Sequence, residues 1–163
     1  MGVLMTRFAG LSILLFLGST ATLASAAPAD TKPYWVSIDQ PEARMRTGPS
    51  TEFPVKWVYK RKNLPVKVIM KHSVWRKIED PDGDQGWIHV RLLSPDRSAI
   101  VLDSVADMRD EPHSGARISW RAEPGVVGHI SECEKGWCLF DVSGRRGYVR
   151  ASQLWGDEEL AAH

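Results

Sequence analysis

The stretch Met45-Arg46-Thr47-Gly48-Pro49-Ser50 decides the fold, because it occurs a second time in weaker form. Its echo, Met108-Arg109-Asp110-Glu111-Pro112-His113, starts 63 positions later. Further matches follow at offsets of 63, 62, 61 and 61, in the pairs Trp57 and Trp120, Trp75 and Trp137, Gly86 and Gly147, Leu93 and Leu154. A duplicated unit that loses residues in its loops gives such a shrinking offset. The sequence therefore predicts two copies of one small domain.

Both copies are built from short runs of β-branched and aromatic residues separated by turn residues, which is the pattern of strands. In the first copy we expect strands at 34–38, 43–46, 56–60, 65–71, 74–79 and 86–90, then one helical turn at 91–93. In the second copy we expect them at 100–102, 108–109, 117–121, 126–133, 136–142 and 147–150. No window keeps a helical period over three turns. The predicted fold class is all-β, with two small antiparallel barrels of about five strands each, over 34–94 and 98–155.

The N-terminal segment reads as a secretory signal peptide rather than as part of the fold. Arg7 precedes an apolar run, Phe8 to Leu17, and small residues then lead to Ala24-Ser25-Ala26. A membrane anchor is the alternative, but the run is shorter than the ~20 residues that a spanning helix needs. We expect a signal peptide over 1–26, a leader over 27–33, and a secreted, periplasmic mature chain with no transmembrane segment.

The charge of the mature chain is balanced overall but divided between its halves. Residues 27–97 hold 13 Lys and Arg against 9 Asp and Glu, a net of +4, whereas residues 98–163 hold 7 against 11, a net of −4. The opposite signs are compatible with attraction between the halves or to a charged partner. Solvated surface charge is the favoured explanation, because isolated surface pairs contribute little. Neither half is basic enough to indicate that the protein binds nucleic acid. The acidic residues near the end make 156–163 an expected tail.

The motif around Arg46 gives the chain its resemblance to a known family. Arg46-Thr47-Gly48-Pro49-Ser50, then Trp57, then Gly86-Trp87-Ile88 resemble the bacterial SH3-like domain family, over nearly all of residues 34–94. The second copy is more degenerate, with Asp110-Glu111 in place of Thr47-Gly48 and Tyr148 in place of Trp87. The resemblance implies a non-enzymatic, exported module that binds peptides, cell-wall material or protein partners. The acidic, tyrosine-rich loop of eukaryotic SH3 domains is missing, so their proline-rich ligands are not carried over.

A ligand groove in the first barrel is one interpretation of its aromatic residues. The residues that would line it are Tyr34, Trp35, Arg46, Trp57 and Trp87. The alternative is that most of these aromatic side chains are core residues, because so small a barrel needs them for burial. Loss of the glycine corner in the second copy places the expected ligand in the first barrel, with the second as a structural partner.

Cys133 and Cys138 are the two cysteines, and they flank Glu134-Lys135-Gly136-Trp137. Four intervening residues suit a hairpin tip, where cysteines on adjacent strands face each other at a distance that allows a disulfide. A redox pair favours two intervening residues, and zinc needs two more ligands. We therefore expect a structural disulfide.

Catalytic and metal-binding patterns are weak. The histidines are scattered, at His72, His89, His113, His129 and His163, with no His-Glu-x-x-His motif. Asp80, Asp82 and Asp84 around Gly83 resemble a calcium loop, but they lack its twelfth-position glutamate, and a turn explains them. We expect no enzyme, metal or cofactor. The predicted function is an exported SH3-like binding or scaffold module for an envelope peptide, peptidoglycan or a protein. The alternatives are a purely structural envelope protein and an accessory or regulator of a cell-wall hydrolase.

Overall fold

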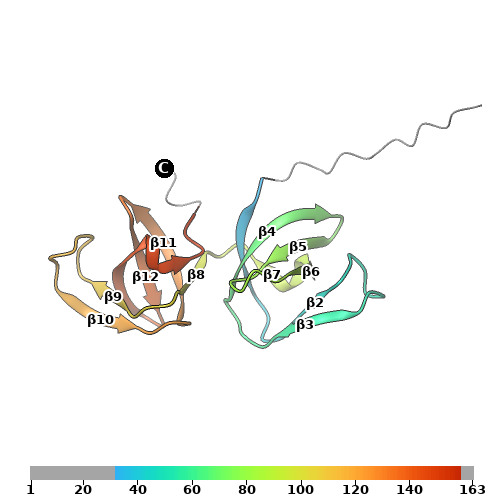
Figure 1. The fold of residues 1–163 in the computed structure, drawn as a ribbon, viewed down its shortest axis with the longest axis horizontal. Helices are drawn as coiled ribbons and strands as arrows, with labels where there is room; N and C mark the ends of the chain where they lie inside the picture. The colour runs from blue at the N-terminus through green and yellow to red at the C-terminus, as the bar shows by residue number, and fades with distance from the viewer. Residues whose placement is uncertain (1–31, 159–163) are drawn as a thin grey trace, which may run out of the picture.

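A computed structural model describes residues 32–158 of the chain. The signal peptide expected over 1–26, most of the leader and the end of the acidic tail lie outside the described residues. Within residues 32–158 the strands form two separate sheets that lie side by side, joined by the short link after Ser94 (Figure 1). The hairpins β2–β3 and β9–β10 lie at opposite outer ends of the pair (Figure 1).

The first barrel is formed by the strands β1 to β7 and one 3-10 turn, η1. Their bounds are β1 Tyr34–Ile38, β2 Ala43–Arg46, β3 Val55–Tyr59, β4 Pro65–His72, β5 Trp75–Glu79, β6 Gln85–His89, η1 Val90–Leu92 and β7 Leu93–Ser94. Neighbouring strands pair in the order β3-β2-β6-β5-β4-β1-β7.

The second barrel repeats this series. Its bounds are β8 Ser98–Val101, β9 Ala106–Arg109, β10 Ile118–Ala122, β11 Val127–Glu134, β12 Trp137–Val142, β13 Arg145–Arg150, η2 Ala151–Gln153 and β14 Leu154–Trp155. The strand order β10-β9-β13-β12-β11-β8-β14 is the first order with every strand shifted by seven. The predicted duplication and the all-β fold of two tandem SH3-like barrels are confirmed.

Each barrel has seven strands, one more than the six runs expected in each copy and two more than the rough figure of about five. The additional strand is the two-residue strand after each 3-10 turn, β7 and β14, which returns to pair with the opening strand of its own barrel. Two residues are too few to give a strand pattern. The opening strand β8 also begins at Ser98, two residues before the expected start at Ile100. Ser98 and Ala99 are buried, but such small residues give no β-forming signal in the sequence.

Both barrels keep the same contact between a glycine and a methionine at the centre of the core. Gly86 lies so close to Met45 that an added Cβ would stand 2.5 Å from that side chain, and Gly147 would bring its Cβ to 2.8 Å from Met108. Both methionines are buried. This close approach explains why these glycines recur in the two copies.

At another pair of neighbouring core positions, the two barrels differ in which strand carries the larger side chain. Val66 and Ile78 of the first core correspond in the repeat to Gly128 and Phe140 of the second, and the four are buried. An added Cβ on Gly128 would stand 2.7 Å from the Phe140 ring. The larger ring is therefore accommodated by removing a side chain on the neighbouring strand, which keeps the core close-packed.

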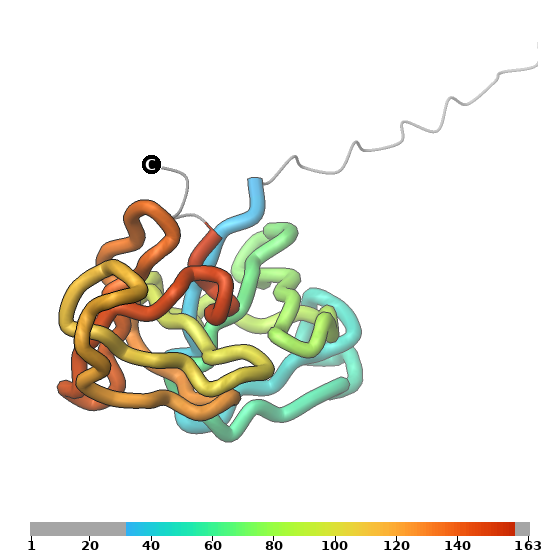
Figure 2. The backbone as a smooth tube through the Cα atoms, turned by 60° about the vertical axis from the view of Figure 1, so that its left-hand side comes forward, coloured from blue at the N-terminus to red at the C-terminus, as the bar shows by residue number. Residues whose placement is uncertain are grey.

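The two barrels contact each other through apolar side chains. Trp35 on β1, 4% exposed, meets Trp155 on β14 edge to face, with ring centroids 4.4 Å apart. Ile100 and Val127 of the second barrel pack against the first core. An ion pair also joins the halves of opposite charge, from Lys67 Nζ to the Glu158 carboxylate at 2.6 Å. The start of β1 and the end of the described chain accordingly lie side by side (Figure 2).

Candidate functional site

Arg46 ends strand β2 and holds the loop that follows it. Its guanidinium Nη1 donates a hydrogen bond to the Phe53 carbonyl at 2.7 Å. In the second barrel, Arg109 Nη1 donates to the Ala116 carbonyl at 2.6 Å, again seven residues downstream. The recurring arginine of the sequence motif thus closes the same loop in both copies.

A shallow depression of about 260 Å³ opens beside Arg46 in the first barrel. Arg44, Arg46 and Arg91 supply positive charge at its edge, while Trp75 and His89 form part of its wall. Glu42 is the carboxylate in the lining, and it pairs with Arg44 at 3.1 Å. Arg46 and Arg91 have no carboxylate partner within residues 32–158. The depression is therefore a cationic surface with an aromatic wall.

His89 is held in its neutral form by its surroundings. Its Nδ1 accepts a hydrogen bond from the backbone N–H of Arg91 at 3.2 Å, and its ring meets Trp75 at a centroid distance of 5.3 Å. Burial, and then the positive charge of Arg91, lower the pKa of His89 below its ordinary value. His89 therefore contributes a neutral imidazole, not a fourth cation, near neutral pH.

The second barrel has a depression of about 360 Å³ at the corresponding place. Arg109 and Trp137 occupy the positions of Arg46 and Trp75 in its lining, and Arg150 takes the position of His89. The Arg150 guanidinium stands 4.7 Å from the centroid of the Trp137 ring, which is a cation–π contact. The depression is thus duplicated along with the fold.

One carboxylate partly neutralises the second depression. Asp107 accepts from Arg109 Nη2 at 2.9 Å and from Arg121 Nε at 3.1 Å. Because Arg109 is partly buried, this pairing also fixes its side chain.

Two of the five residues proposed from the sequence for a groove lie together. Arg46 and Trp87 are cross-strand partners on β2 and β6, and both side chains are half-buried. The Trp87 ring also meets His72 edge to face, with centroids 6.2 Å apart. Trp57 lies on the edge strand β3, where it is 56% exposed.

Tyr34 and Trp35 lie elsewhere, at the start of β1. The Tyr34 ring has Lys71 Nζ 4.7 Å from its centroid, and its hydroxyl accepts from Arg76 Nε at 3.2 Å. Trp35 is covered by Trp155 in the contact between the barrels. The structure therefore does not gather the five side chains into one groove, and ligand binding by them stays a prediction.

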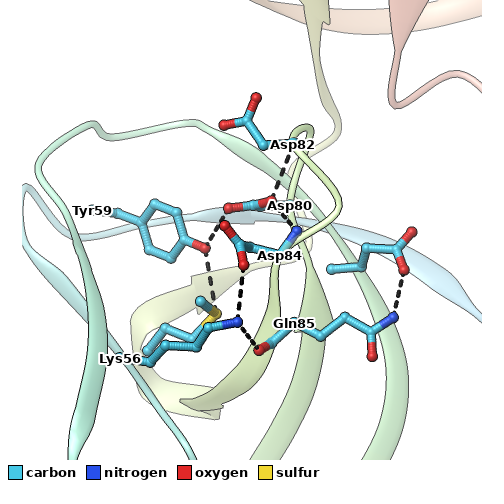
Figure 3. A network of polar contacts seen from close by, with 8 residues as sticks. Lys56, Tyr59, Asp80, Asp82, Asp84 and Gln85 are labelled. Atoms are coloured by element: carbon cyan, nitrogen blue, oxygen red, sulfur yellow. Dashed lines mark hydrogen bonds and ion pairs between the residues drawn. The ribbon is translucent and has the colours of Figure 1, made fainter.

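The aspartates that resembled a calcium loop form a turn around Asp80 (Figure 3). The buried Asp80 carboxylate accepts from the backbone N–H groups of Asp82 at 3.1 Å and Asp84 at 2.8 Å, and from the Tyr59 hydroxyl at 2.9 Å. Lys56 Nζ pairs with Asp84 at 2.9 Å. The Asp80 oxygens thus serve the turn itself, as the alternative interpretation of the sequence held.

The predicted disulfide between Cys133 and Cys138 is confirmed, at the tip of the hairpin β11–β12. Cys133 lines a further depression of about 510 Å³, together with Trp137 and Tyr148. Two glutamates, Glu132 and Glu134, lie at its edge, with Lys135 paired to Glu134 at 3.1 Å. Because both cysteines are oxidised, neither offers a thiol for nucleophilic chemistry.

Among residues 32–158, no three His, Cys, Asp or Glu side chains form a group that could hold a metal ion. The histidines that the structure describes are dispersed. His72 meets Trp87, His89 meets Trp75, and His113 lies 3.3 Å from Glu111 on the surface.

Sequence reasoning missed most of the residues that line the duplicated depressions. The repeat identifies Trp75 and Trp137 as a pair, but no local pattern marks them as walls of a depression. His89, Arg91 and Arg150 belong to no recognisable sequence motif. The repeat could have pointed to four of them, because aligning the copies places Trp75 on Trp137 and His89 on Arg150 at offsets of 62 and 61. Arg91 aligns with Ser152, so the repeat gives no signal for it.

Two small barrels with this strand order define a tandem SH3-like protein. The bacterial SH3 domain family matches residues 39–95 and 103–156, more than half of the chain. The chain belongs to this family, and the resemblance inferred from the Arg46 motif is confirmed.

Two solved structures resemble the chain at low sequence identity. No curated protein matches the sequence. Among solved structures, NlpC2 from Trichomonas vaginalis is 12% identical to this chain, with a TM-score of 0.35. The matched region covers 76% of this chain and 48% of NlpC2. NlpC1 from the same organism is 13% identical, with a TM-score of 0.35, and the matched region covers 84% of this chain and 50% of NlpC1. The chain spans about half the length of these two proteins, and likenesses at this level carry no argument about its activity.

Within the part of the chain that the structure describes, no helix is long and apolar enough to span a membrane.

Proposed function

We propose that this chain is an exported, non-catalytic binding module that attaches to a peptide, cell-wall material or protein of the cell envelope. Membership of the bacterial SH3 family supports a binding role, and the N-terminal sequence pattern supports export. The observation that carries the proposal is the depression beside Arg46, an open cationic surface with a tryptophan wall. Arginine and tryptophan are among the residues that most often dominate the binding energy of an interface, and this surface combines the two.

The site extends from this depression to the outer face of β6. Arg46 is the cross-strand partner of Trp87, so a ligand lying over β2 and β6 would meet both side chains. Trp57 on the edge strand is the cross-strand partner of the buried Met45, so it lies on the other face of the sheet and outside this site. Arg46 also holds the loop after β2, so its removal tests folding as well as binding.

A pull-down on purified peptidoglycan and on its stem peptides tests the proposal, with the mature chain from residue 27 and a scrambled-peptide control. Crosslinking in the intact envelope covers protein partners. We expect retention that falls with Arg91→Gln and Trp87→Ala while the melting temperature stays close to that of the wild type. The matched control is Arg61→Gln, an exposed arginine outside the depression. Absence of both retention and specific crosslinks would overturn the proposal.

A purely structural role is the second candidate, and the contact between Trp35 and Trp155 favours it. This packing joins the barrels through apolar side chains, as in a protein that acts as one block. In that case Trp87→Ala would lower stability and partner capture in parallel, rather than capture alone.

A further inference from the structure

We propose that each barrel carries its own site for a peptide carboxylate, so that one chain binds two carboxylate groups at equivalent positions. This inference rests on the proposed function and names its ligand chemistry. It also revises the expectation that binding belongs to the first barrel alone.

The geometric basis is a set of equivalent residues in two separate depressions. Arg46 and Arg109 bridge to the carbonyl seven residues downstream in each barrel, at 2.7 and 2.6 Å. Each then stands in a depression walled by the same tryptophan of the repeat, Trp75 or Trp137. Although the second copy lost the Gly48 corner, it kept the arginine, its hydrogen bond and the tryptophan. Loss of the corner is therefore no reason to exclude a second site.

The charge of the linings points to an anion. The first depression has Arg44, Arg46 and Arg91 against Glu42, and the second has Arg109, Arg121 and Arg150 against Asp107, so each carries a net charge of +2. The second case is informative, because residues 98–163 have a net charge of −4 and hold seven Lys and Arg. Three of these seven line this one depression. Positive charge is thus concentrated where the rest of the barrel is acidic, which focuses an anion there.

The available donors suit a carboxylate. Arg91 has no ion-pair partner within residues 32–158, and Arg150 lies over the Trp137 ring. A guanidinium stacked on an aromatic ring keeps its in-plane N–H groups for bidentate contact with a planar carboxylate. Volumes of about 260 and 360 Å³ would hold one acidic side chain or one chain terminus each, together with its apolar stem against the tryptophan.

Two variants separate the sites, and a third is a matched control. Arg91→Gln removes a cation from the first depression, and Arg150→Gln removes one from the second. Arg145→Gln removes an arginine from the same strand as Arg150, β13, where its guanidinium stands 4.8 Å from the Trp120 centroid outside the depression. The two sites have separate reporters, because the indole N–H groups of Trp75 and Trp137 give distinct nitrogen–proton resonances.

The experiment titrates the mature chain with acetyl-Glu-Ala-Glu, and in parallel with its uncharged analogue acetyl-Gln-Ala-Gln amide and with inorganic phosphate. We expect both indole resonances to move with the acidic peptide, neither with the amide, and a calorimetric stoichiometry of two peptides per chain. Arg91→Gln should weaken binding at Trp75 about tenfold and leave Trp137 unchanged, and Arg150→Gln should do the reverse. Arg145→Gln should change neither.

Movement of one indole alone would overturn the second site, and equal response to the amide would overturn carboxylate recognition. Equal binding of phosphate would replace the peptide carboxylate by a general anion as the ligand. If the chain is retained on peptidoglycan or crosslinked to a partner while acidic peptides leave both indoles unmoved, the carboxylate inference fails and the proposed function stands. Loss of retention together with unmoved indoles overturns both.

Discussion

Gly48 lies under the ring of Phe53, so that a Cβ added to the glycine would stand 2.5 Å from the ring. The corresponding pair in the second barrel is Glu111 and Ala116. The second copy could lose its glycine because the aromatic ring above it was also lost. The two positions therefore behave as one unit, and the missing glycine is a paired change rather than simple decay of the motif.

This pairing predicts a non-additive effect of two substitutions. Gly48→Ala should lower the free energy of unfolding by roughly 1–3 kcal/mol, because the new methyl group overpacks against Phe53. In a Phe53→Ala background the same substitution should cost much less. Urea unfolding of the wild type, both single variants and the double variant measures the coupling. Additive costs would contradict the steric explanation.

The hydrogen bond from Tyr59 to Asp80 predicts a dependence of stability on alkaline pH. Burial, and then this hydrogen bond, raise the pKa of Tyr59 far above its ordinary value of 10.0. Unfolded tyrosine ionises near that value while the folded state keeps its proton, so the unfolded state binds fewer protons above it. The contribution of Tyr59 is therefore complete below about pH 10 and declines as the pH rises further.

Tyr59→Phe tests this assignment. At neutral pH it should cost roughly 1–3 kcal/mol, because Asp80 loses one of its buried donors. The difference in unfolding free energy between wild type and variant should narrow between about pH 8 and pH 11, because phenylalanine does not ionise. Denaturant unfolding at both pH values gives the comparison. A constant difference would mean that Tyr59 does not ionise differently in the two states.

The fold could be predicted from the sequence because its main signals are local and are repeated. Alternating β-forming runs and turn residues gave the strands, and the pair Trp57 and Trp120 gave the duplication. The two-residue strands β7 and β14 could not be predicted, because their pairing depends on where the preceding 3-10 turn directs the chain.

The candidate site was less accessible to prediction because aromatic residues look alike in a sequence whether they are buried or exposed. Trp35 and Trp57 both occur in β-forming runs, yet one is buried between the barrels and the other is largely exposed. Burial of Trp35 depends on Trp155, which lies 120 positions away in the sequence. Such a contact follows from how two domains pack, and no local pattern encodes it.

The disulfide should contribute modestly to stability. Because Cys133 and Cys138 are five positions apart, the bond closes a very short loop. Chain entropy then gives about 2 kcal/mol, near the lower end of the usual range. Replacing both cysteines by alanine should lower the free energy of unfolding by about that amount, as measured in urea. A much larger loss would indicate that the hairpin tip depends on the bond for its conformation.

The contact between Trp35 and Trp155 should make the two barrels unfold together. A small domain usually unfolds in one cooperative transition, and two domains share that transition only when their interface stabilises both. Trp155→Ala removes the aromatic contact and leaves the apolar surface of Ile100 and Val127 less covered. We expect a loss of about 3 kcal/mol and separation of one thermal transition into two. Calorimetry measures both effects.

Trp120→Ala is the matched control, because Trp120 is 45% exposed in the same barrel and lies outside the interface. It should leave a single transition. If Trp155→Ala does the same, the barrels are coupled by the link and the ion pair from Lys67 to Glu158 rather than by the tryptophans.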